Sequence, residues 1–332
     1  MFVIDNYTLA IFLCIITMLC WGSWANTQKL ASKKWGFPLF YWDYTLGVIL
    51  LSLVFGLTLG STGDTGQAFL PNLGQASLNA IFYAILGGVV FNISNLLLVA
   101  AIDIAGMAIA FPIGIGIALV LGVIVNYSAS PVGDPILLFT GVGLVTLAIV
   151  VDALVYKRIS KGGATTKGIA ISLAAGILMG FFYRFVAVSM SEDFSNPTSG
   201  LLTPYTAVFV FSIGIFISNF IFNTFFMYKP ISGEKVTYQD YFKIGTPKLH
   251  LIGILGGAIW ALGFLLNMIA AGEAGFAISY GLGQGATMVA AIWGIFIWKE
   301  FKNAPKGTNN LLGLMFLLFI AGLTLIIMAK NS

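Results

Sequence analysis

The chain has 332 residues, of which 59% are apolar and 8% are charged, and its mean hydropathy is +0.98. Soluble domains carry about 25% charged residues, so this composition cannot cover a water-exposed surface and the bilayer is the solvent. The net charge of +4 comes from basic residues spread over several loops, which argues against a nucleic-acid-binding patch.

Ten apolar runs are long enough to cross a membrane, since a spanning helix needs roughly 20 apolar residues. In chain order they are residues 7–28, 39–60, 78–102, 105–127, 135–156, 168–190, 203–228, 249–272, 274–298 and 309–329. The links near 103 and 273 are very short, but merging across either would give helices too long for a bilayer. The sequence therefore predicts an all-α integral membrane protein with ten transmembrane helices.

The basic residues predict the orientation of these helices. Of the 16 Lys and Arg residues, all except Arg184 and Lys330 fall in alternate connections. Basic loops stay in the cytoplasm, so we expect both termini to lie outside a cell membrane, whether inner or plasma membrane.

One apolar segment occurs twice. AIDIAGMAIAFPIGIG at 101–116 returns 169 residues later as AAGEAGFAISYGLGQG at 270–285. Five crossings separate the copies, so they point in opposite directions through the membrane. This pattern predicts two inverted five-helix repeats, residues 1–156 and 168–332, joined by a cytoplasmic linker at 157–167.

Both copies are interrupted by residues that weaken a helix. Pro112 removes a backbone donor in the first copy. The glycines that accompany it are Gly114, Gly116, Gly281, Gly283 and Gly285. Interrupted segments at matching places in two halves are typical of transporter substrate sites. Small residues every four positions also allow transmembrane helices to pack closely, and both interpretations stay open.

Several stretches resemble members of the drug/metabolite transporter superfamily. CWGSWANTQKLA at 20–31 resembles the first helix of bacterial glucose and ribose uptake porters. WKEFKNAP at 298–305 is similar to those porters and to rhamnose–proton symporters, whereas YWDYTLGVILLSLVFGLTLGS and FNTFFMYKPISG are similar to ureide permeases. The resemblance implies transport of sugars, or of allantoin-like heterocycles and nucleobases. Plant ureide permeases carry a long central loop with a P-loop-like segment, but KRISKGGATTK here lacks the GxxxxGK(S/T) pattern, so no nucleotide is expected.

Polar and aromatic residues at membrane depth are candidates for binding a solute. Asn92 and Asn95 share a face of the third helix, and the 169 offset relates Phe91 to Trp260 in the eighth. The full set of candidates is Trp21, Asn92, Asn95, Trp260, Asn267, Tyr280 and Gln284. Amides and flat rings suit a neutral solute, although such amides also join helices to one another.

Ionisable residues within the spans are candidates for coupling. Arg184 could pair with Glu273 or contact the solute, and Asp43 and Asp152 could carry a proton. Both aspartates also lie close enough to the interface to be merely solvated. His250, which begins the eighth helix, is expected to be exposed.

The pattern as a whole predicts a secondary active transporter. It would take up a small neutral polar metabolite, and a sugar of the ribose, glucose or rhamnose type is the leading candidate. Uptake would be coupled to the movement of a proton or another cation. A ureide or nucleobase permease and a drug or metabolite exporter are the alternatives. No Ser/His/Asp set or metal-ligand cluster stands out, so neither an enzyme nor a cofactor is expected; the sequence leaves a homodimer open.

Overall fold

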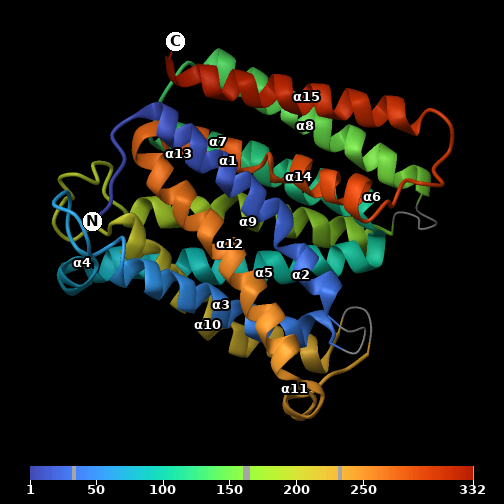
Figure 1. Cartoon of the computed structure of the whole chain (residues 1–332), viewed down its shortest axis with the longest axis horizontal. Coiled ribbons are helices and arrows are strands. Elements are labelled where there is room, and N and C mark those ends of the chain that lie inside the picture. The colour runs from blue at the N-terminus through green and yellow to red at the C-terminus, as the bar shows by residue number, and fades with distance from the viewer. Residues whose placement is uncertain (32–34, 160–164, 231–233, 332) are drawn as a thin grey trace.

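The computed structural model describes residues 1–31, 35–159, 165–230 and 234–331 (Figure 1). Its long helices are α1 (Tyr7–Ser23) continued by α2 (Ala25–Leu30), α3 (Phe37–Leu57), α5 (Leu78–Ala105), η1 (Phe111–Ile115) continued by α7 (Gly116–Ala129), α8 (Pro135–Ile159), α9 (Thr166–Ser189), α10 (Pro204–Tyr228), α12 (Pro247–Ala274), α13 (Phe276–Gly283) continued by α14 (Ala286–Ile292) and η2 (Trp293–Ile297), and α15 (Thr308–Met328). Shorter elements are α4 (Phe69–Gln75), α6 (Met107–Ala110), α11 (Tyr238–Ile244) and η3 (Ala329–Asn331). Within the described ranges, β-type pairing is limited to an isolated bridge between Met190 and Leu202.

Ten of these helical segments are long and apolar enough to span a bilayer, which confirms the predicted all-α membrane fold. The short links fall at Gly106 and Gly275, slightly later than the expected positions near 103 and 273. Both glycines adopt the same unusual backbone conformation, with φ 77° and ψ 162° at Gly106 and φ 83° and ψ 151° at Gly275. A side chain strongly disfavours this region, so glycine is the residue that permits a one-residue link.

Local sequence explains where several helices begin. Ser77 and Thr165 accept hydrogen bonds from the backbone of the first turns of α5 and α9. Proline occupies the first turn of α3, α10 and α12, where its missing N–H would have no helical partner. Local sequence thus defines where these helices start, whereas contacts between side chains determine how the helices pack.

The helices lie roughly along the long axis of the molecule (Figure 1). Both chain ends and α4 lie in the left half of the view, and α11 lies at the bottom. The pair α8 and α15 forms one edge of the bundle, while α3 and α10 lie toward the other side. If the basic loops face the cytoplasm, the end with both termini is the outer end; this orientation stays a prediction.

Glycines allow the central helices to approach closely. A Cβ at Gly88 of α5 would collide with the carbonyl oxygen of Phe211 in α10, and one at Gly257 of α12 would collide with that of Tyr44 in α3. Gly88 and Gly257 are related by the 169 offset. These glycines lie where α5 packs on α10 and where α12 packs on α3. In the same way, α5 packs on α9, and α12 packs on α1. An inverted repeat requires corresponding pairs of this kind. The division into two repeats remains an interpretation. Residues 160–164 of the expected linker lie outside the described residues.

We expect Gly106→Ala and Gly275→Ala each to lower stability by roughly 1–3 kcal/mol, because alanine is strained at this backbone conformation. Gly143→Ala is the matched control, since its Cβ would meet nothing within 4 Å and alanine is the better helix former. Melting temperatures of the purified variants in detergent give the comparison. Link variants as stable as Gly143→Ala would show that the glycine conformation is not required.

Candidate functional site

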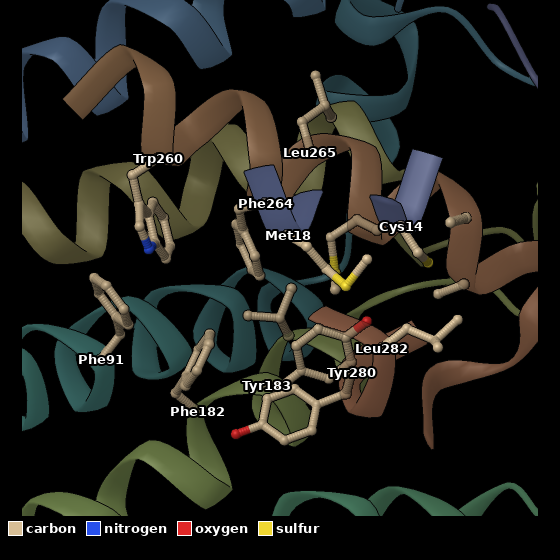
Figure 2. Close-up of a cluster of buried hydrophobic side chains, with 14 of the residues drawn as sticks. Cys14, Met18, Phe91, Phe182, Tyr183, Trp260, Phe264, Leu265, Tyr280 and Leu282 are labelled. Atoms are coloured by element: carbon tan, nitrogen blue, oxygen red, sulfur yellow. The ribbon is translucent and has the colours of Figure 1, made fainter. Parts of the chain in front are cut away.

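Aromatic side chains from six helices meet near the middle of the bundle. We call them the central aromatic cluster, which consists of Trp21, Tyr44, Phe91, Phe182, Phe211, Trp260 and Phe264. The rings of Trp21 and Trp260 are stacked with centroids 6.1 Å apart and an interplanar angle of 12°. Figure 2 shows Phe91 and Phe182 facing Trp260 and Phe264. The cluster offers flat apolar walls from both halves of the chain.

The closest rings in this cluster come from corresponding positions of the two halves. The centroids of Phe91 on α5 and Trp260 on α12 are 4.4 Å apart, and the 169 offset relates these residues. Both are at least 95% buried. Two side chains that the sequence offset relates therefore meet where α5 approaches α12.

The two amides of α5 have different surroundings. Asn92 is fully buried, and its Nδ2 donates to Ser218 Oγ at 2.8 Å and to the Ile215 carbonyl at 3.3 Å, both on α10. Asn95 Nδ2 donates to the hydroxyl of Tyr41 on α3 at 3.3 Å. The Oδ1 atom of Asn92 has no hydrogen-bond partner among the described residues. Asn92 thus joins helices and still holds a free acceptor.

Asn267 and Tyr280 take part in a closed network on the other side of the centre. Asn267 Nδ2 donates to the Ser279 carbonyl at 2.8 Å, and its Oδ1 accepts from the Tyr183 hydroxyl at 2.7 Å. The Tyr280 hydroxyl donates to the Ala118 carbonyl at 3.1 Å. These residues therefore use their polar groups to hold α9, α12, α13 and α7 together.

Trp21 and Gln284 complete the set of predicted binding residues. Trp21 is half-buried, and its Nε1 donates to the Trp260 carbonyl at 3.3 Å. Gln284 lies in the turn between α13 and α14, half-buried, and its side chain bonds to no other described residue. Trp21 thus belongs to the central aromatic cluster, whereas Gln284 lies at the helix break.

The predicted helix breaks take different forms in the two halves. Pro112 and Gly114 lie in the π-helical turn η1, and Gly116 begins α7. In the second half, Gly281 and Gly283 lie within helical α13, and the turn comes at Gln284 and Gly285. A Cβ at Gly283 would lie 2.7 Å from the Trp21 ring. This glycine makes room for the aromatic cluster.

A buried carboxylate, that of Asp43, lies near the start of α3, where α11 contacts this helix. Asp43 is 1% exposed, and His250 Nδ1 lies 2.9 Å from its Oδ1 and 3.0 Å from its Oδ2. The hydroxyl of Tyr241 on α11 also donates to Asp43. Burial and this hydrogen bond raise the pKa of Tyr241, which keeps the phenol a donor. The rings of Trp35 and His250 pack edge to face, with their centroids 5.2 Å apart.

The expectation that His250 is exposed was therefore wrong. Its side chain is 28% exposed, because α3, α11 and Trp35 enclose the first turn of α12. Asp43 is likewise not a merely solvated residue, since the same groups exclude water from it.

Asp152 lies in a second charged group at this end of the bundle. It is 3% exposed, its Oδ1 has no partner in the described part of the chain, and the nearby charge is that of Glu300. Glu300 accepts from the Tyr156 hydroxyl at 3.2 Å and pairs with Lys29 at 2.7 Å. This group links α2, α8 and the segment that follows η2.

Arg184 and Glu273 are not brought together as an ion pair among the described residues. The acid whose charge acts on half-buried Arg184 is Glu192. Glu273 instead borders a hollow of about 230 Å³ at the end with both termini, together with Glu192 and Asp193. Arg184 thus belongs to the outer end of the bundle on our orientation.

Sequence reasoning missed several residues that the structure places beside the predicted ones. Tyr44 is fully buried and lies 4.9 Å from Trp24 and 6.4 Å from Trp260, measured between ring centroids. Tyr41 stacks on Tyr44 at 5.1 Å. Their i, i+3 spacing in YWDYT was a signal that they share one face of the second spanning helix.

Comparison with known proteins identifies the family. A protein-family model described as ureide permease matches residues 40–164 and 157–330. The chain belongs to the ureide permease family. Ureide permease 1 of Arabidopsis thaliana is 24% identical over 100% of this chain and 99% of its own length, and ureide permease 4 of the same plant gives the same identity and coverage.

Two further matches are more distant. A Lactococcus lactis protein named for sugar uptake, YxfA, is 23% identical over 97% of this chain and 99% of its own length. A crystal structure with 14% identity has a TM-score of 0.59 and covers 97% of this chain and 98% of that one, which shows a shared fold. The ten spans and the permease relatives together make this ureide permease family member a multi-pass membrane transporter of small metabolites.

Asn267→Ala should lower stability by about 1–3 kcal/mol, because it removes two buried hydrogen bonds, one from the Tyr183 hydroxyl and one to the Ser279 carbonyl. Asn95→Ala removes one long hydrogen bond and should cost less than about 1 kcal/mol. Melting temperatures of both variants in one detergent test this order. Equal losses would contradict the assignment of Asn267 to the closed network.

Proposed function

We propose that this protein takes up a small neutral solute with adjacent N–H and C=O groups, a ureide or nucleobase, by alternating access. The observation that carries the proposal is the central aromatic cluster, in which rings from both halves surround the contact between Phe91 and Trp260. The rings present flat apolar faces, and the amides of α5 lie on the same helix as Phe91. A planar heterocycle that needs paired hydrogen bonds fits this combination.

A sugar is the second candidate. The Lactococcus lactis relative named for sugar uptake supports it, and aromatic walls with amides also suit a sugar ring. The flat ring faces favour a planar solute over a puckered polyol. Export of a lipophilic cation, the third alternative, would require an acidic group facing the cluster; the polar residues of α5 that adjoin it are neutral.

The glycine links support alternating access as the mechanism. Gly106 and Gly275 join helices without the hydrogen-bonded overlap of a continuous helix, so each allows α6–α7 or α13–α14 to change angle against α5 or α12. Substrate sites between two inverted halves open to opposite sides when such segments move.

Proton coupling is the proposed driving force, with Asp43 as the carrier. Its carboxylate is buried within a spanning helix yet contacts an imidazole that is 28% exposed. A carboxylate at membrane depth that has a titratable neighbour is typical of proton-driven transporters. The charged residues of the adjacent segments are Asp240 and Lys243 on α11 and Lys248 in the first turn of α12.

Proteoliposomes with the purified protein should accumulate labelled allantoin or uracil more than glucose or ribose. Trp260→Leu should raise the KM about tenfold, because a stacked aromatic contact and its buried area are lost. Trp42→Leu is the matched control, since Trp42 packs on Phe216 and Phe220 outside the cluster. Uptake of sugars in preference to both heterocycles would overturn the proposed substrate class.

Asp43→Asn should abolish accumulation driven by a pH gradient while solute exchange between equal pools continues, because asparagine cannot carry a proton. Asp152→Asn is the control, as the other buried aspartate near this end of the bundle. Accumulation and counterflow are measured on the same vesicles. Loss of driven uptake in Asp152→Asn but not in Asp43→Asn would move the carrier to the group around Glu300.

A further inference from the structure

Asn219 in α10 is a fully buried amide whose Nδ2 and Oδ1 atoms both lack a hydrogen-bond partner among the described residues. Buried polar groups in folded proteins are bonded in the great majority of cases, and an unsatisfied one is costly. An amide with both ends unpaired inside a transmembrane bundle therefore calls for a partner that the rest of the chain does not supply.

The neighbours of Asn219 on α10 define the direction in which it points. Ser212, two turns away, contacts Ser52 of α3 at 3.1 Å between hydroxyl oxygens. Asn223, one turn in the other direction, donates to the Pro38 carbonyl of α3 at 2.8 Å. Residues with this spacing share one helix face. Asn219 thus faces α3 between two polar contacts that join the helices.

The third side of this junction is α5. Asn92 bonds to Ser218, the residue that precedes Asn219, and keeps its Oδ1 unpaired. The Oδ1 of Asn223 also has no partner in the described chain. The junction of α3, α5 and α10 therefore contains unpaired acceptors from three amides and one unpaired amide donor group, that of Asn219.

The three helices of this junction also contribute Tyr44, Phe91 and Phe211 to the central aromatic cluster. Tyr41 accepts from Asn95 of α5 and stacks on Tyr44, whose ring lies 6.4 Å from that of Trp260. The Tyr44 hydroxyl is buried and also has no hydrogen-bond partner within the described ranges. On α10, Phe211 of the cluster lies two turns from Asn219.

We propose that Asn219 and Asn92 form the polar subsite for the solute, binding the edge that carries its N–H and C=O groups. An asparagine side chain presents a donor and an acceptor side by side, which matches a –CO–NH– edge through two hydrogen bonds. The excess of acceptors selects a solute with more than one N–H donor. The subsite rests on the proposed uptake of a ureide or nucleobase and names the residues that read its polar edge.

The test uses Asn219→Leu, which keeps the approximate shape without the polar atoms, and Asn219→Ala in case the larger side chain disturbs folding. Asn126→Leu is the matched control, because Asn126 of α7 is also buried with an unpaired Oδ1, and its Nδ2 bonds within its own helix. Labelled allantoin uptake into proteoliposomes and melting temperature in detergent are measured for each variant. Hydantoin and its mono-N-methyl derivatives serve as unlabelled competitors.

We expect the Asn219 variants to melt at or above the wild-type temperature, since replacing an unpaired polar group is neutral or stabilising. Their KM should rise about tenfold or more, with no change in Asn126→Leu. N-methylation should weaken competition more in the wild type than in Asn219→Leu, which keeps only Asn92 of the subsite.

The contrary results separate the two proposals. An unchanged KM, or a marked loss of melting temperature in both Asn219 variants, would overturn the subsite while transport stands. A wild-type protein that takes up none of the heterocycles would overturn the proposed substrate class, and the subsite with it.

Discussion

A bilayer core supplies no water, so each backbone N–H and C=O within it must find its partner in the protein. This constraint governs where the helices of this chain can be interrupted. The π-helical turn that contains Pro112 is covered by α9, where a Cβ at Gly176 would lie 2.6 Å from the Gly114 carbonyl oxygen. The turn at Gly285 is covered by α1, whose Met18 sulfur lies beside it. Each break is thus shielded by the helix that begins the opposite half.

The same constraint divides the centre of the bundle into two unlike sides. On the side of α9, α12 and α13, the polar atoms of Asn267, Tyr183 and Ser279 satisfy one another. On the side of α3, α5 and α10, atoms of Asn92 and Asn219 have no hydrogen-bond partner in the part of the chain that the structure describes. A solute gains little by competing with a satisfied network, because it must break bonds as good as those it forms. Polar recognition is therefore expected on the second side, with the aromatic rings between the two.

The spans and the glycine links were predictable from the sequence because they depend on composition and on local backbone chemistry. Runs of apolar residues fixed the ten helices, and the two glycines that allow a positive φ lie at matching positions of the repeated segment. The polar contacts were less accessible. Helical spacing placed Asn92 and Asn95 on one face but did not reveal that one bonds to α10 and the other to α3. His250 and Tyr241 meet Asp43 only because α11 folds back against the first turn of α12.

One turn of α3 connects the proposed solute site with the proposed proton carrier, Asp43. Tyr41 bonds to Asn95, Tyr44 faces Trp260, and Asp43 between them bonds to His250 and Tyr241. A displacement of this turn that admits solute between α3 and α5 changes the surroundings of the carboxylate as well. Linkage then requires reciprocity: whatever factor protonation of Asp43 applies to solute affinity, bound solute applies to proton affinity. Because both groups lie on one rigid helical turn, coupling needs no relay of side chains through the bundle.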